Sequence, residues 1–336
     1  MDKKKKWLAV SLTVSIISML VILILTVDEN TFVYLSKIQP IYLLIAIGLN
    51  IFSWFVWGLR IKILAESLGS RIHIIKSTKI VVANLLVAAV TPSMAGGEPV
   101  RIHLLNKNGM TAGDATAVVF GERALDALFL GITAPIAMFL FQDIVRDQIY
   151  VSMLFALAGI LLFCLLGMMI YALFRHDNLK RWLSALFRWI IPKFTRKYAI
   201  NIDNIVTRIN TEIDNFNRSL WRLLREGKVA LVLATICTIA FWLLGFAIPS
   251  FILMGLGADP VWLYSIIAQI ILTFIMMIPI TPGGSGLAEL GLVSLYATFV
   301  HIPLLGILAV IWRVVTYYSN IIAGSIISLK MLKDGS

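Results

Sequence analysis

Long apolar stretches separated by short polar segments make up most of the chain. A helix needs about 20 apolar residues to cross a bilayer, and six stretches suit such helices: 7–27, 40–59, 115–141, 149–174, 229–256 and 303–329. The first stretch follows four lysines and has no small-residue cleavage site after it, so we interpret it as a retained helix and not as a signal peptide. The pattern predicts an all-α polytopic membrane protein with about six to eight transmembrane helices.

Two further pairs of apolar segments are each interrupted by proline and glycine. The first pair, 78–95 and 97–110, flanks TPSMAGGEPVR, and the second pair, 261–280 and 284–300, flanks TPGGSGLAELG. Non-helical backbone at membrane depth is tolerated only where protein buries it or where it lines a cavity. We therefore expect one or two broken or re-entrant hairpins. The second pair is either such a hairpin or two full spans, and the hairpin would make the two halves of the chain roughly inverted copies.

The two interruptions share an order of residues that predicts hinges and an acid beside them. The corresponding positions are Thr91 and Thr281, Pro92 and Pro282, Gly96 and Gly286, and, offset by one residue, the acids Glu98 and Glu289. The other glycines at these hinges are Gly97, Gly283 and Gly284. Paired interruptions in opposite halves indicate a midplane binding site in a transporter fold. The alternative is a pair of packing kinks whose acids face solvent near a membrane surface. A role in close helix approach also stays open for Gly283, Gly284 and Gly286.

The distribution of lysine and arginine predicts the orientation in the membrane. Residues 60–79 are basic, with Arg60 among them, the loop 142–148 is acidic on balance, and the last span ends in Lys330 and Lys333. Cytoplasmic loops carry an excess of lysine and arginine. We predict a multi-pass protein of the cell membrane with both termini in the cytoplasm.

The chain is expected to form a single membrane domain over residues 1–336. Its first half would be 7–174 and its second half 229–329, joined by the basic segment 175–228. In that segment apolar side chains recur at helical spacing between basic ones, which is typical of helices lying at a membrane interface. We interpret it as a helix packed on the membrane face of the protein rather than a helix that binds a partner.

Composition agrees with a membrane location and excludes several function classes. Hydrophobic residues make up 60% of the chain and charged residues 14%, against about 25% charged in soluble domains. The net charge of +11 is placed beside apolar spans, where it attracts anionic lipids, so we expect no nucleic-acid partner. No histidine or cysteine pair has metal-ligand spacing, and no nucleotide-binding loop or Ser-His-Asp set is present. We therefore predict neither a metal nor a cofactor.

Ionisable residues inside the apolar stretches are the candidate substrate-binding residues: Glu98, Arg101, Glu122, Arg123, Asp126, Glu289 and Arg313. A charge at the bilayer centre costs roughly 2.5–3.5 kcal/mol even on lenient scales, so these groups must pair, meet water or lie at a shallower depth. Three guanidinium groups suit a phosphate, and the surplus carboxylate suits a cation or a proton relay. The alternative is a set of ion pairs that only pin helices together.

Taken in order, TPSMAGGEPVRIHLL, GERALD, TPGGSGLAELG and the intramembrane Arg313 resemble the transmembrane domain of MprF-type lysylphosphatidylglycerol synthases, whose stand-alone relatives are usually named flippase-like domain proteins. The resemblance implies a lipid translocase in which the broken helices form the headgroup path. The positions that match its motifs are Gly96, Gly97, Glu98, Arg101, Glu122, Arg123, Asp126, Pro282, Gly283, Gly286 and Glu289. The chain ends seven residues after Leu329, so we expect no aminoacyl-transferase domain and no synthase activity.

The resulting hypothesis is a flippase that moves a polar-headgroup lipid, either an aminoacylated phospholipid or another phospholipid or glycolipid, through a charged midplane cavity without chemical change. Membrane lipids would be its partners, and a homodimer is compatible with the sequence. Two other classes stay open. One is an ion-coupled carrier of a small soluble solute, and the other is a lipid-modifying membrane enzyme that uses the carboxylates as acid and base.

Overall fold

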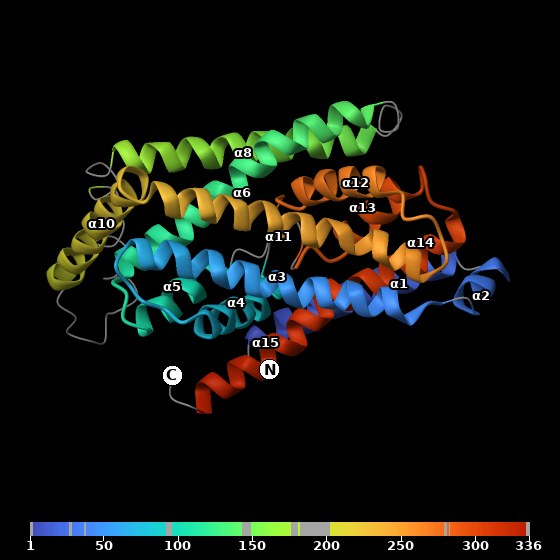
Figure 1. The fold of residues 1–336 in the computed structure, drawn as a ribbon, viewed down its shortest axis with the longest axis horizontal. Coiled ribbons are helices and arrows are strands. Elements are labelled where there is room, and N and C mark those ends of the chain that lie inside the picture. Colours follow the sequence, from blue (N-terminus) through green and yellow to red (C-terminus); the bar gives the residue numbers. More distant parts are fainter. Residues whose placement is uncertain are drawn as a thin grey trace.

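The computed structural model describes residues 3–26, 29–36, 38–91, 96–142, 149–175, 181, 202–278, 281 and 283–333. Across these residues the fold is helical and contains no strand, which confirms the predicted all-α class. Figure 1 shows the helices gathered into one elongated bundle. The helices are α1 (Lys3–Thr26), α2 (Glu29–Ser36), α3 (Pro40–Ser67), α4 (Ile74–Ala89), α5 (Gly97–Lys107), α6 (Ala112–Leu140), α8 (Ile149–Phe174), α10 (Ile202–Arg225), α11 (Lys228–Gly255), α12 (Trp262–Ile275), α13 (Leu287–Tyr296), α14 (Ile302–Arg313), the π-helical η1 (Val314–Tyr318) and α15 (Ser319–Lys333).

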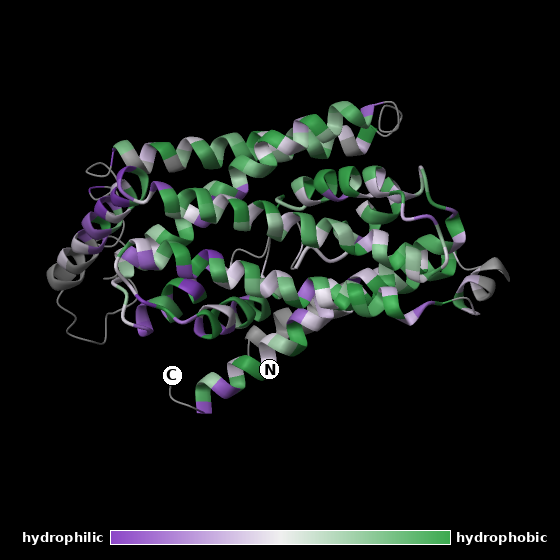
Figure 2. Cartoon of the chain, viewed as in Figure 1, coloured by the Kyte–Doolittle hydropathy of each residue, from purple (hydrophilic) through white to green (hydrophobic). Residues whose placement is uncertain are grey.

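Four helices in the described part are long and apolar enough to cross a membrane. They are α3, α6, α11 and the continuous helix Ile302–Lys333 formed by α14, η1 and α15. Shorter apolar helical segments lie in α1, α8, α12 and α13. Figure 2 shows apolar residues along the long helices and hydrophilic residues concentrated on α10, at one end of the bundle. Helix length and composition therefore support the predicted multi-pass membrane protein.

Two antiparallel helices of equal length, α3 and α11, form the centre of the bundle. Each has 28 residues. The backbone N–H of Gln39, just before α3, donates to the carbonyl of Gly255 at the end of α11 (2.8 Å). Farther along, Arg60 of α3 reaches Thr238 of α11. Since an early residue of one helix meets a late residue of the other, the two run in opposite directions, as Figure 1 also shows.

The elements around α3 and α11 follow the same order in both halves of the chain. After α3 come the short α4, a break, α5 and the long α6; after α11 come the short α12, a break, α13 and the long helix that starts with α14. The packing corresponds as well. The long helix α6 packs on α12 of the other half, and α15 packs on α4.

Both predicted interruptions do end helices. Helix α4 ends at Ala89 and α5 begins at Gly97, whereas α12 ends at Ile275 and α13 begins at Leu287. The two breaks touch. The backbone N–H of Gly283 donates to the carbonyl of Thr91 (3.1 Å), and the Tyr317 hydroxyl donates to the carbonyl of Ala89 (3.0 Å). The hinge prolines Pro92 and Pro282 lie outside the described residues.

Helix α3 extends beyond the predicted span 40–59. It continues to Ser67, so Arg60 lies inside the helix and not in a basic loop. The apolar residues Ile61 and Leu64 beyond it are fully buried. The helix can continue past an arginine because neighbouring helices supply carboxylates to that arginine, which a charge facing lipid would lack.

The segment between the two halves contributes α10, which packs on α6. Its apolar residues Phe216, Leu220 and Leu223 are buried, and the ring of Phe216 meets that of Phe120 at 5.2 Å between centroids. The stretch RWLSALFRWIIPKF of the same segment lies outside the described residues, apart from Arg181. The described part is thus a helix held against the protein by its apolar face.

A close approach of α3 to α4 provides a test of this packing. A Cβ atom on Gly58 would lie 2.9 Å from the backbone N and Cα of Thr78, whereas one on Gly48 of the same helix would meet nothing within 4 Å. We expect Gly58→Ala to lower the free energy of unfolding by about 1–3 kcal/mol through overpacking. Gly48→Ala should leave it unchanged or raise it, since alanine favours helix more than glycine. Thermal unfolding in detergent measures both, and equal midpoints for the two variants would contradict this packing.

Candidate functional site

A cluster of six charged side chains lies inside the bundle where α3, α5 and α6 meet. Its members, which we call the central cluster, are Arg60, Glu98, Arg101, Glu122, Arg123 and Asp126. Helix α3 supplies one of them, α5 two and α6 three. Glu122 and Asp126 are four residues apart on α6 and therefore share one face of that helix, and both meet Arg60.

Arg60 bridges two carboxylates at the centre of the cluster. It is 1% exposed. Its Nε donates to Glu122 Oε1 (3.0 Å), and its Nη1 donates to Asp126 Oδ1 (2.7 Å) and to Thr238 Oγ1 (3.0 Å). The side chain of Arg60 therefore ties α3 to α6 and α11 with charge-assisted hydrogen bonds.

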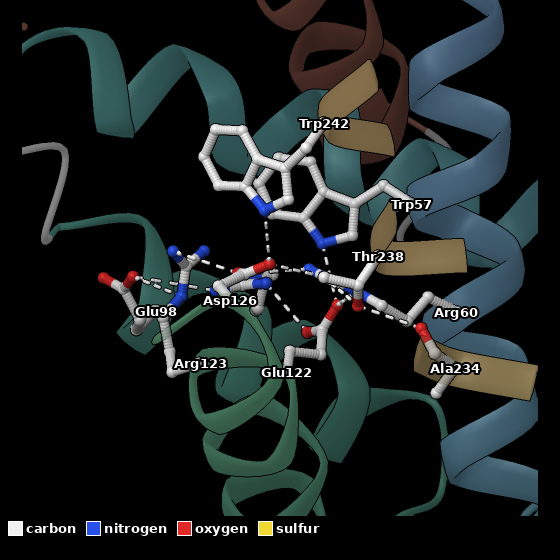
Figure 3. A network of polar contacts seen from close by, with 10 residues as sticks. Trp57, Arg60, Glu98, Glu122, Arg123, Asp126, Ala234, Thr238 and Trp242 are labelled. Atoms are coloured by element: carbon white, nitrogen blue, oxygen red, sulfur yellow. Dashed lines mark hydrogen bonds and ion pairs between the residues drawn. The ribbon is translucent and has the colours of Figure 1, made fainter. Parts of the chain in front are cut away.

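Two indole groups donate further hydrogen bonds to these carboxylates. Trp57 Nε1 donates to Glu122 Oε1 (2.8 Å), and Trp242 Nε1 donates to Asp126 Oδ1 (3.1 Å). Figure 3 shows both indole nitrogens directed at the carboxylates. A buried carboxylate is stable only when its lone pairs are satisfied, and the two tryptophans supply donors without adding charge.

Arg101 is fully buried and forms an ion pair with Glu122. Both Arg101 and Glu122 are 0% exposed, and Arg101 Nη1 donates to Glu122 Oε2 (2.8 Å). The guanidinium also lies 5.0 Å from the centroid of the Trp57 ring, a cation–π contact. Its Nε and Nη2 have no hydrogen-bond partner, although Nη2 is 3.7 Å from Glu98. Arg101 thus neutralises Glu122 from a fully buried position.

The pair formed by Glu98 and Arg123 is the open edge of the central cluster. Arg123 Nε lies 3.2 Å from Glu98 Oε1, and the two side chains are 38% exposed for Arg123 and 27% exposed for Glu98. Arg123 Nη1 also lies 3.5 Å from Asp126 Oδ2. Figure 3 shows this pair to one side of the buried carboxylates. A partly exposed ion pair gains little net free energy, so a ligand can separate these two groups at low cost.

A second, fully buried ion pair lies at the other break. Arg313 Nε is 2.9 Å from Glu289 Oε1, and its Nη2 donates to Glu289 Oε2 (3.0 Å) and to the carbonyl of Gly284 (3.1 Å). Glu289 also accepts from Ser15 Oγ (2.7 Å) and from the backbone N–H of Gly286 (2.7 Å). The carboxylate therefore caps the start of α13 while it neutralises the arginine.

The glycines of the breaks are needed for conformation and for close approach. Gly283, Gly284 and Gly286 have positive φ angles of 60°, 68° and 85°, which other residues rarely adopt. A Cβ atom on Gly283 would lie 2.4 Å from the carbonyl oxygen of Ala89. The first break follows the same principle. A Cβ atom on Gly97 would lie 2.1 Å from Asn84 Oδ1.

One cavity of about 380 Å³ lies between the central cluster and the second ion pair. Charged residues on its wall are Arg60, Glu98, Arg123, Asp126 and Arg313. Aromatic rings and carboxamides form much of the remainder: Trp54, Trp57, Phe241, Trp242, Trp312, Tyr317, Asn50, Asn84, Gln269 and Asn320. Small-molecule sites combine apolar walls with a few placed polar groups in this way. The cavity is thus a candidate binding site shared by both halves.

The predicted site residues divide into two groups by position. Glu98, Arg123, Asp126 and Arg313 line the cavity, as does the hinge residue Gly284. Arg101, Glu122 and Glu289 are not on its wall and are fully buried. The hinge residue Thr91 accepts a hydrogen bond from the backbone N–H of Gly96 (3.0 Å), and Thr281 Oγ1 is buried without a hydrogen-bond partner.

Arg60 was not among the predicted site residues, and the predicted charge balance lacked it. With Arg60 included, four arginines face four carboxylates in these ion pairs, so the expected surplus of carboxylate was wrong. The apolar continuation Ile61, Ile63 and Leu64 after this arginine is the signal that could have placed it inside a span. The aromatic and carboxamide wall of the cavity was also missed, because such residues inside apolar stretches do not reveal which way they face.

Comparison with known proteins assigns a family. The profile of the lysylphosphatidylglycerol synthase transmembrane region matches residues 8–324. A UPF0104 membrane protein of Archaeoglobus fulgidus is 31% identical over 94% of this chain and 94% of its own length. One from Pyrococcus horikoshii is 23% identical over 98% of each chain, and one from Methanothermobacter thermautotrophicus is 26% identical over 76% of this chain and 75% of its own. No solved structure matches significantly. The chain belongs to the family of the lysylphosphatidylglycerol synthase transmembrane region.

The role of Arg60 can be tested through stability. Replacing it by Gln leaves Glu122 and Asp126 buried without their central cation, so we expect a loss of about 3–5 kcal/mol in the free energy of unfolding. Lys62→Gln, which breaks an exposed pair with Glu66 on the same helix, should change it by less than about 1 kcal/mol. Adding Asp126→Asn to Arg60→Gln should recover part of the loss, because it removes one uncompensated charge. Thermal unfolding in detergent measures each value, and a wild-type midpoint for Arg60→Gln would refute the bridging role.

Proposed function

We propose that this member of the family is a lipid translocase, which moves a lipid with a polar, phosphate-containing headgroup between leaflets without altering it chemically. The observation that carries the proposal is the cavity between the two broken helices, with the partly exposed pair of Glu98 and Arg123 on its wall. Membership in a family defined on the membrane region of a lipid synthase supports the same substrate class.

The proposed binding step uses the weakest ion pair of the cluster. A headgroup phosphate would replace Glu98 as the partner of Arg123, since a guanidinium binds phosphate with two parallel hydrogen bonds. Glu98, once released, would accept a hydrogen bond from a hydroxyl or amine of the same headgroup. Arg60, Glu122 and Asp126 would stay paired behind them, so the site would need no large rearrangement of buried charge.

The second ion pair would extend the path across the cavity. Arg313 lines the wall but already contacts Glu289 and the carbonyl of Gly284, so it would act as a fixed positive charge near the second break. The neighbouring aromatic rings and carboxamides would take the uncharged parts of the headgroup. The acyl chains would remain in lipid, because only the headgroup pays a penalty for leaving water.

We infer a transporter topology from the correspondence of the two halves. The antiparallel pair α3 and α11, each followed by a short helix, a break and a second helix, supports an inverted repeat. In this topology α4–α5 and α12–α13 are re-entrant hairpins that approach the midplane from opposite faces. Both termini would lie in the cytoplasm, where the basic end of the chain meets anionic lipid.

The test is translocation in reconstituted vesicles. Headgroup-labelled phosphatidylglycerol and phosphatidylethanolamine are placed in both leaflets, and a reductant that cannot cross the membrane bleaches the outer label. We expect wild-type protein to expose the inner label faster than empty vesicles do. Glu98→Gln combined with Arg123→Gln should slow this exposure at least about tenfold. This factor corresponds to the loss of one charge-assisted hydrogen bond to the headgroup, which is worth about 1.5–3 kcal/mol.

The matched control is Lys62→Gln combined with Glu66→Gln, which removes an exposed ion pair on α3 outside the cavity. It should translocate at the wild-type rate. Exposure no faster than in empty vesicles would refute the proposal, and equal rates for both double variants would remove Glu98 and Arg123 from the path. Uptake of a soluble solute would favour a solute carrier, and a chemically altered lipid in the same vesicles would favour a lipid-modifying enzyme.

A further inference from the structure

A second, smaller pocket lies between the beginning of α4 and the end of α15. It has a volume of about 70 Å³, and its lining consists of Lys76, Lys79, Ile80, Asn108, Ile327, Lys330 and Met331. It shares none of these residues with the wall of the central cavity. The pocket is therefore a separate feature, and a ligand bound in it requires neither translocation nor the central cluster.

The crossing of two helices creates this pocket. Helices α4 and α15 lie close together at Gly324, where a Cβ atom would lie 2.9 Å from the carbonyl oxygen of Val82 and 2.8 Å from Leu86 Cβ. Small residues allow such close crossings. The pocket lies beyond this point, between the first turns of α4 and the last turns of α15, and Figure 1 shows α15 continuing past the bundle toward the C-terminus.

The positive charge of the pocket is not balanced by carboxylates, whereas every arginine of the central cluster and of the second ion pair contacts a carboxylate. Helices α4 and α15 contain no aspartate or glutamate. In the described part of the chain, no ion pair joins Lys76, Lys79 or Lys330 to an acid. Lys107, next to Asn108 of the lining, adds a further positive charge. Clustered charges of one sign produce a potential that concentrates ligands of the opposite sign.

The floor of the pocket is apolar, which distinguishes it from an ordinary basic surface. Ile80 is 1% exposed, and Ile327 and Met331 complete the apolar part of the lining. Lysine ammonium groups offer three donors each at the end of a flexible stem. A free anion would use only the lysines, whereas a lipid would place its phosphate among them and its glycerol and first acyl carbons on the isoleucines and the methionine.

We propose that this pocket binds the headgroup phosphate of an anionic phospholipid. Basic pockets between membrane helices bind such headgroups where the helices meet the membrane surface. The bound lipid bridges α4 and α15 at the end where their packing opens, and so stabilises the crossing at Gly324. Since α4 leads directly into the first break, lipid composition acts on the helix that carries the hinge.

Lipid binding to the purified protein tests the site. Phosphatidylglycerol is titrated into detergent-solubilised protein, and the unfolding temperature is followed, because a ligand that binds only the folded state raises it. We expect K76Q/K79Q/K330Q to bind about 100-fold more weakly than wild type, from about 1 kcal/mol for each lysine near an anionic headgroup. The single variant K330Q, which changes one exposed side chain, should weaken binding about fivefold.

The matched control is R71Q/R218Q/K228Q, which removes three exposed positive charges from other described positions. It should bind phosphatidylglycerol as wild type does. Without lipid, all four proteins should unfold at the same temperature. Equal losses in the two triple variants would show a general effect of net charge and would overturn the site. Equal stabilisation of wild type by phosphatidylcholine or by inorganic phosphate would likewise overturn its assignment to an anionic lipid.

Discussion

The pairing of charge inside an apolar bundle is the constraint on which this structure depends. An arginine left alone in such an interior costs several kcal/mol, as does an unpaired carboxylate. Arg60 meets this constraint by binding Glu122 and Asp126 at once, and its hydrogen bond to Thr238 reaches the helix on its other side. The positions of α3, α6 and α11 are therefore linked, because none can move far without leaving one of these charges unpaired.

The charged residues differ in solvent exposure, and this difference separates ion pairs that hold the structure from the pair that can exchange partners. Arg101 and Glu122 are fully buried, and so is Glu289, whereas Glu98 and Arg123 retain about a third of their side-chain exposure. Buried pairs hold their geometry because separation exposes an uncompensated charge. Partly exposed pairs exchange partners at little cost. A site that binds and releases a charged ligand needs both properties, with a rigid pair behind an exchangeable one.

Much of the fold and of the candidate site can be predicted from the sequence, and the features that cannot be predicted depend on contacts between distant residues. Apolar length predicts α3, α6, α11 and the last long helix, and Pro-Gly clusters predict both breaks. The ionisable residues in apolar stretches, such as Glu98 and Arg313, mark the site because each demands a partner. Arg60 is the exception. It follows an apolar stretch and resembles the basic end of a span. The apolar residues after it indicate that the helix continues, but its partners are carboxylates of α6, which are distant in sequence. The π-helical segment η1 likewise depends on tertiary contact, since Asn50 of α3 donates to the carbonyl of Val315 within it (2.8 Å).

The two breaks are joined directly, and this limits how the cavity between them can change shape. Gly283 bonds to Thr91 through the main chain, and Tyr317 of η1 bonds to the carbonyl of Ala89. Both bonds end on carbonyl groups at or just after the end of α4. A displacement of one break relative to the other lengthens both bonds, and a carbonyl that loses a hydrogen bond in an apolar setting costs free energy. The breaks therefore move together, or they separate only when water or a polar ligand replaces the lost partners. Tyr317 of η1 thus makes one of the two contacts between the breaks, and it lies on the same continuous helix as Arg313. Its position agrees with the frequent occurrence of π-helical segments at functional sites.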